Sequence, residues 1–234
     1  MPGMFYYGFD VTYLILVVPA IILALWAQFN VKSTFAKYSK TASWGGMTGY
    51  DSARRILDAN GLTNVRIERV SGDLTDHFNP KDNTVYLSET VHSVSSAAAV
   101  GVAAHEAGHA VQYAVGYTPM KIRSAIIPVT NLGSNLAMPL VLLGVVLGFP
   151  AVAYLGVAAF GLSTFFQLVT LPVEFNASSR AMVALRTCGM DEGGLKSARK
   201  VLTAAALTYV AALAVSLANL IRILLVAKRG SRRR

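Results

Sequence analysis

The segment His105-Glu106-Ala107-Gly108-His109 holds the side chains best suited to chemistry in this chain of 234 residues. On a helix, residues four positions apart share a face, so both imidazoles can reach one metal ion at about 2.0–2.1 Å. Glu106 is offset by one position and can reach a metal-bound water as a general base. The chain has only four histidines and five glutamates, so this pattern is not expected by chance. It has a single cysteine, which excludes a cysteine-based zinc site.

A catalytic zinc needs a third protein ligand and an open fourth position. Glu174 directly follows a long apolar run, and a lone acid at a membrane boundary is a functional candidate. His77 lies in a turn-rich stretch and stays open as a fourth ligand, an oxyanion donor or an ordinary loop histidine. His92 precedes the predicted helix and is expected to be structural.

The composition points to a membrane protein, because 54% of the residues are hydrophobic and only 14% are charged. Typical soluble domains have about a quarter of their residues charged, and disordered chains have low hydrophobicity. Charge-free runs cover 11–31, 124–173 and 201–221. About 20 apolar residues cross a bilayer, so the middle run predicts two spans that turn near residues 148–150. The sequence therefore predicts four spans.

The region between the first two spans has the pattern of a small folded domain. Apolar spacing predicts helices, and alternation predicts two strands that we expect to form a hairpin. The expected elements are a helix at 48–61, a strand at 65–70, turns at 71–83, a strand at 84–89 and a helix at 93–116 that carries the two histidines.

The net charge of +9 does not indicate nucleic-acid binding, because six basic residues lie together after the last apolar run, where a lipid headgroup contact is expected. Segments 32–123 and 174–200 carry ten and five further basic residues. The two spans predicted within 124–173 separate these segments, so both lie on one side, which the positive-inside rule makes cytoplasmic. The same count places the basic tail outside, against that rule, unless the last segment does not fully cross.

Together, the motifs HEAGHA, GDLTDHFNP and LPVEFNAS resemble the YugP-type neutral zinc metallopeptidases of bacterial membranes over most of the chain. The resemblance implies one zinc ion per chain, held by His105, His109 and Glu174, with Glu106 as the catalytic base. It also implies an integral protein of the bacterial cytoplasmic membrane.

A wider kinship is with membrane zinc peptidases of the HtpX type. In those proteins an Asp follows the metal-binding Glu by four residues, whereas this chain has Ser178. The partner that orients a zinc histidine is therefore expected to be Asn176 or Ser178.

The expected fold is a mainly α membrane protein, with about four transmembrane helices and a small α+β zincin-like domain that carries the HEAGH helix. The expected organisation is an N-terminal anchor at 1–31, the metallopeptidase domain at 32–123, a transmembrane hairpin at 124–173, the segment with the third ligand at 174–200, and a hydrophobic helix with a basic tail at 201–234.

The expected function is hydrolysis of peptide bonds at the membrane face by Glu-assisted attack of zinc-bound water. The substrate is a peptide or a membrane protein, received along strand 84–88 by strand addition, and His77, Arg180 or Tyr113 supplies an oxyanion donor. The alternative is a non-catalytic zinc-binding membrane scaffold or chaperone-like partner, for which Glu106 has no use. Charge-free spans disfavour a transporter, and the Ala-rich histidine helix disfavours a site inside the bilayer.

Overall fold

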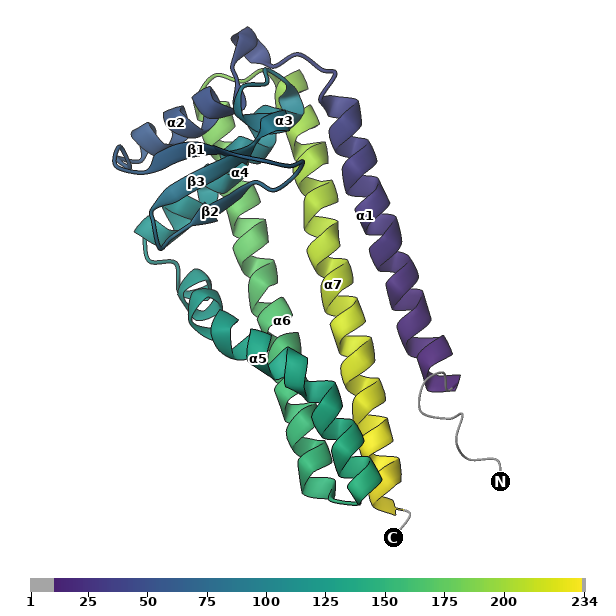
Figure 1. Cartoon of the computed structure of the whole chain (residues 1–234). Coiled ribbons are helices and arrows are strands. Elements are labelled where there is room, and N and C mark those ends of the chain that lie inside the picture. The colour runs from purple at the N-terminus through teal and green to yellow at the C-terminus, as the bar shows by residue number, and fades with distance from the viewer. Residues whose placement is uncertain (1–10, 233–234) are drawn as a thin grey trace. The chain divides into compact units, whose positions relative to one another are not determined.

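The computed structural model describes residues 11–232, and Figure 1 shows the order of its helices and strands. The chain divides into two compact units. The helical unit comprises Met1–Ala27, Ile122–Thr170 and Thr208–Arg234, and the α/β unit comprises Gln28–Lys121 and Leu171–Leu207. The four long helices, α1, α5, α6 and α7, each contribute one part of their length to each unit.

Four helices are long and apolar enough to cross a membrane, which confirms the four predicted spans within residues 11–232. They are α1 (Val18–Tyr38, preceded by a π-helical turn at Tyr13–Val17), α5 (Thr118–Leu147), α6 (Pro150–Thr187) and α7 (Glu192–Arg232). Only 11% to 28% of the residues in their apolar windows are buried within the molecule. Exposed apolar surface of this extent belongs in lipid, so the chain is an integral membrane protein.

In the helical unit, the helices pack through small residues and hydroxyl groups. A side chain at Gly144 would collide with Ala153, so α5 and α6 approach closely there. The hydroxyl groups of Thr164 on α6 and Ser216 on α7 are hydrogen-bonded at 2.8 Å. Close packing at small residues and hydrogen bonds between helices are common in membranes, where the hydrophobic effect does not drive helices together. The predicted turn near residues 148–150 is confirmed, because α5 ends at Leu147 and α6 begins at Pro150.

The α/β unit contains a short mixed sheet and three further helices. Its elements are α2 (Gly49–Ala59), β1 (Arg66–Val70), β2 (His77–Asn79), β3 (Thr84–Ser88), α3 (Glu89–His92) and α4 (Ala97–Ala114). Thr48 and Asp51 form a capping box that fixes the start of α2. The helix expected at 93–116 is confirmed as α4, which begins at Ala97 because Ser96 caps it by accepting a hydrogen bond from the Ala99 backbone.

The strand order is β1-β3-β2, and β1 runs parallel to β3. The expected hairpin between residues 65–70 and 84–89 is therefore wrong. Residues 71–83, expected from the sequence to form turns, contain β2. This strand reverses the chain and pairs antiparallel with β3, so β3 runs in the same direction as β1. Because β3 is paired on both sides, strand 84–88 cannot accept a substrate strand, and that expectation is also wrong. The outer edge of β2 is not paired with any described strand.

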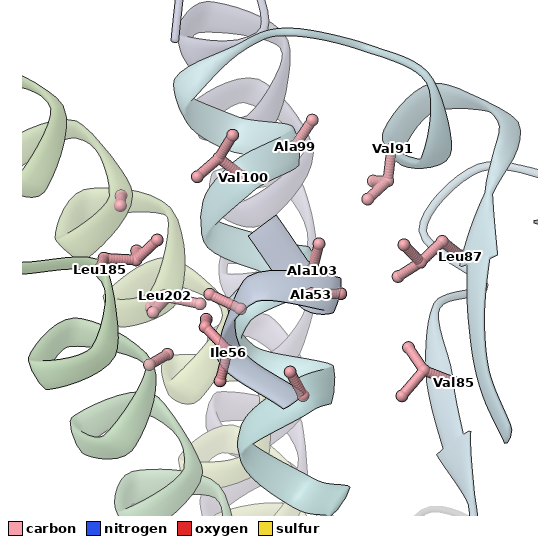
Figure 2. Packing of buried hydrophobic residues seen from close by; sticks show 14 of the residues in the cluster. Ala53, Ile56, Val85, Leu87, Val91, Ala99, Val100, Ala103, Leu185 and Leu202 are labelled. Atoms are coloured by element: carbon pink, nitrogen blue, oxygen red, sulfur yellow. The ribbon is translucent and has the colours of Figure 1, made fainter. Parts of the chain in front are cut away.

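Within the α/β unit, β3 packs against one side of α4, and α6 and α7 pack against the opposite side, as Figure 2 shows. Val85 and Leu87 of β3 point toward Ala103 and its neighbours, while Leu185 of α6 and Leu202 of α7 point toward the opposite side. All these side chains are buried. The alanines of α4 are therefore core residues, whose small size lets neighbouring elements lie close to the helix backbone.

Two glycines of α4 allow the closest of these approaches. A Cβ atom at Gly101 would lie 3.2 Å from the Cβ of Ala198 on α7, and one at Gly108 would lie 2.8 Å from the carbonyl oxygen of Ala177 on α6. Gly108 costs about 1 kcal/mol of helix propensity relative to Ala. The close approach expected from its mid-helix position is confirmed.

We predict that Gly108→Ala destabilises the protein by about 1–3 kcal/mol despite its better helix propensity, because the new methyl overlaps the Ala177 backbone. Thermal unfolding in detergent measures the change. Gly161→Ala is the matched control, since its Cβ would meet only Leu220 Cδ1 at 4.0 Å. Equal stability of the two variants would contradict the role given to this contact.

Candidate metal centre

Three potential metal ligands converge inside the α/β unit. His105 and His109 come from α4 and Glu174 comes from α6, and their ligand atoms all lie within 4.8 Å of one another. The Glu174 Oε2 atom lies 3.1 Å from His105 Nε2 and 3.6 Å from His109 Nε2. Ligand bonds of about 2.0–2.2 Å to a tetrahedral ion place neighbouring donor atoms at similar separations. The three side chains could therefore hold one metal ion.

Burial makes this cluster more than a surface coincidence. Glu174 is 1% exposed and His109 is 7% exposed, while the side chain of His105 is 12% exposed. A carboxylate in such a place requires a cation or several hydrogen bonds. Glu174 does not begin a new segment after the apolar run, because α6 continues through it to Thr187. The helix itself carries this acid from the apolar stretch into the α/β unit.

The far nitrogen of His105 is held by a hydroxyl group. Its Nδ1 lies 3.1 Å from Ser178 Oγ, and Ser178 is one helical turn beyond Glu174 on α6. A serine hydroxyl can accept the Nδ1 proton, which leaves the Nε2 lone pair directed at Glu174. Ser178, one of the two partners expected from the sequence, therefore lies where it can orient this imidazole.

The far nitrogen of His109 is held by Gln112, which sequence reasoning missed. Gln112 Nε2 donates both of its protons, to the Val173 carbonyl at 2.8 Å and to Asn176 Oδ1 at 3.0 Å. Its Oε1, 2.9 Å from His109 Nδ1, must then accept, so Nδ1 carries the proton and Nε2 is free to bind a metal. The available signal was its spacing, three residues after His109 on the same helix.

The hydrogen-bond chain extends one residue further. Asn176 Oδ1 also accepts a hydrogen bond from Arg180 Nε at 2.8 Å. Asn176, the other partner expected for a zinc histidine, thus acts through Gln112 and has no hydrogen bond of its own to an imidazole in the described chain. The resulting chain His109–Gln112–Asn176–Arg180 fixes the position of each member by its neighbours.

Glu106 lies beside this cluster and is not one of its three members. It is 8% exposed and shares a face of α4 with Tyr113, whose ring contacts Phe78 of β2 at 5.9 Å between centroids. Glu106 therefore lies on the side of α4 that contacts β2, next to the histidines.

A second carboxyl group, Asp76, lies near Glu106 and was not anticipated. Burial raises the pKa of Asp76, the charge of Glu106 raises it further, and hydrogen bonds from Ser88 oppose both effects. The Ser88 backbone N–H donates to Asp76 Oδ1 at 2.7 Å, and the Ser88 hydroxyl donates to Oδ2 at 2.9 Å. Asp76 thus fastens the start of β2 to the end of β3.

The other histidines are not part of the described metal cluster. His77 is exposed in β2, where its ring stacks on Tyr86 at 4.9 Å and its Nδ1 lies 2.9 Å from the Thr75 carbonyl. It belongs to a strand, so the reading as a loop histidine is wrong. His92 contacts Ser93 and the ring of Tyr50, in keeping with a structural role.

The comparisons with known proteins identify the family of the chain. The chain matches a family described as "Putative neutral zinc metallopeptidase" over residues 13–228. The chain belongs to this family. It is also 47% identical over 222 residues to a Bacillus subtilis (strain 168) protein named "Putative membrane protease YugP", with 93% of this chain and 97% of that protein covered. No solved structure matches the chain significantly. The family membership confirms the resemblance inferred from the motifs, and it makes zinc the metal to test.

We predict that Gln112→Leu lowers zinc affinity by about 10–100-fold, because His109 loses the acceptor that fixes its tautomer. Competition with a chelator of known affinity measures the change. Gln167→Leu, in the apolar part of α6, controls for the loss of an amide. Unchanged zinc affinity in Gln112→Leu would show that His109 needs no such support.

We predict that Asp76→Asn changes the pH dependence of stability. The pKa of Asp76 is raised in the folded protein, so its contribution is greatest at acid pH and is lost as the pH rises through the folded pKa. The amide side chain of the variant does not titrate, so the variant does not lose this stability as the pH rises. The amide oxygen can still accept the hydrogen bond from the Ser88 N–H. The variant should therefore gain stability relative to wild type between roughly pH 4 and neutrality.

Thermal unfolding of both proteins at several pH values checks this, and Asp73→Asn, at an exposed site of the same loop, controls for the lost charge. A difference between Asp76→Asn and wild type that is the same at every pH would contradict the assignment.

Proposed function

We propose that His105, His109 and Glu174 hold one zinc ion per chain and that Glu106 is the general base of a peptidase. The observation that carries the proposal is the convergence of two imidazole Nε2 atoms on a buried carboxylate, with both Nδ1 atoms engaged by the protein. Two neutral imidazoles and one carboxylate are a ligand set typical of hydrolytic zinc sites. When bound, zinc lowers the pKa of a water molecule toward about 7 and polarises a carbonyl group.

In this proposal Glu106 accepts the proton of the attacking water and then delivers it to the leaving amine. Its burial and its place beside, but not within, the ligand cluster support this role. A non-catalytic zinc scaffold would need the three ligands but no acid at this offset. The position of Glu106 next to the ligands, on the side of α4 that contacts β2, therefore favours an enzyme.

The free edge of β2 offers a place for the substrate. An extended peptide that pairs with residues His77–Asn79 would lie along the face of α4 that carries Glu106 and Tyr113, because Phe78 contacts Tyr113. Backbone hydrogen bonds would then set the register of the scissile bond, and the fixed position of Asp76 on Ser88 would hold the strand in place. The substrate is a peptide or an extended segment of a membrane protein.

Glu106→Gln should keep about one zinc per chain but lower turnover by about 10²–10⁴-fold, since it removes only the base. Glu174→Ala should lose both zinc and activity, since it removes one of three ligands. Metal analysis together with cleavage of a panel of peptides and membrane proteins measures both, with Glu89→Gln as an exposed control. Full turnover in Glu106→Gln would exclude this mechanism, and full zinc in Glu174→Ala would exclude the ligand set.

We propose that the α/β unit lies on the cytoplasmic side of the bacterial membrane. The segments 32–123 and 174–200, with ten and five basic residues, fall almost entirely within this one compact unit, so they share a side. A cysteine at the exposed position 73, in a Cys188→Ser background, should react with an impermeant maleimide in inverted vesicles but not in intact cells. Labelling in intact cells would reverse the orientation.

A further inference from the structure

A cavity of about 350 Å³ lies in the α/β unit, away from the Glu106 face of α4. Ile56 of α2, Gly108 and Val111 of α4, and residues between Ser179 and Cys188 line it. On the α4 helix, Gly108 and Val111 point away from the face that carries Glu106 and Tyr113. The cavity is therefore separate from the place proposed for the substrate.

One cation lines this cavity without a counter-ion. Arg180 uses Nε to bind Asn176, and no other hydrogen bond or ion pair of its guanidinium is found among residues 11–232. No Asp or Glu is among the lining residues. An arginine stays charged at any physiological pH, and its two terminal nitrogens match the two oxygens of a carboxylate. Because Asn176 already fixes Nε, the guanidinium is held in place for such a partner.

The rest of the lining is mainly apolar. Ile56, Val111, Val183 and Ala184 supply hydrocarbon surface. Two of the polar lining groups are already used locally, because Asn60 Nδ2 donates to the Ile56 carbonyl and Thr187 Oγ1 donates to the Val183 carbonyl. A peptide backbone would find few partners there, whereas an aliphatic chain needs none.

We propose that this cavity binds a single-chain amphiphile with a carboxylate head, such as a medium-chain fatty acid, through Arg180. The carboxylate pairs with the guanidinium and the aliphatic chain lies against the apolar lining. The volume is at the small end of the range of about 300–1,000 Å³ for ligand pockets, which favours one chain over a two-chain phospholipid. The binding site does not depend on zinc or on the proposed peptidase activity.

Cys188 provides a built-in reporter, because it is the only cysteine of the chain and it lines the cavity. The experiment measures the rate of Cys188 alkylation by N-ethylmaleimide in the full-length, zinc-loaded protein in neutral-lipid nanodiscs. Decanoate should slow the reaction several-fold, whereas decanol and decyltrimethylammonium should not. A cysteine at position 73 in a Cys188→Ser background should be unaffected by all three, which excludes a general effect of the additives on the membrane.

Variants separate the head from the chain. Arg180→Gln should abolish the protection by decanoate, Arg180→Lys should keep part of it, and Arg186→Gln, an exposed arginine on the same helix, should keep all of it. Ala184→Phe should slow alkylation without any ligand, because it fills the cavity. Equal protection by decanol and decanoate in wild type, or full protection in Arg180→Gln, would overturn the proposal. The wild-type comparison stands by itself if a variant fails to fold.

Discussion

The arrangement of the α/β unit depends on one buried carboxylate. Glu174 lies in the interior with its Oε2 at 3.1 Å from His105 and 3.6 Å from His109, and an isolated charge there would be costly. The two helices that carry these groups must therefore stay close. The Gly108 contact with Ala177 makes this possible, since any larger residue would separate α4 from α6. Small residues in α4 are thus a geometric requirement of the site.

Two uncharged side chains hold the two histidine ligands in place by hydrogen bonds. Ser178 and Gln112 each occupy the Nδ1 side of one imidazole, and both are neutral. Gln112 is fully buried, but its amide makes three hydrogen bonds, so its burial leaves no unmet polar atom. A neutral shell of this kind fixes both rings while leaving the Glu174 carboxylate as the one negative charge among the three donors.

The helix α6 runs from the apolar helical unit into the α/β unit, where it contributes to the metal cluster. One continuous helix carries the apolar stretch of the helical unit, then Glu174, Ser178 and the arginine of the cavity. The same few turns therefore contribute a ligand, the partner of His105 and the cation at Arg180. Glu174 and Ser178 lie on one face of the helix, and the residues that line the cavity lie mainly on the opposite face.

The sequence alone determined the features that depend on local spacing. The interval of four residues between His105 and His109, the length of the apolar runs and the break near residues 148–150 each specify a helix face, a span or a turn without distant contacts. Only the tertiary structure decided which residues complete them. Gln112 reaches Asn176 across 64 positions in the sequence and Ser178 reaches His105 across 73. The strand order β1-β3-β2 brings Asp76 near enough for the charge of Glu106 to act on it. Such contacts join elements that are distant in sequence, so no local pattern specifies them. The sequence placed the substrate-accepting strand at residues 84–88, whereas in the structure β2 has the unpaired edge. Strand pairing depends on contacts between distant segments, so local patterns could not predict it.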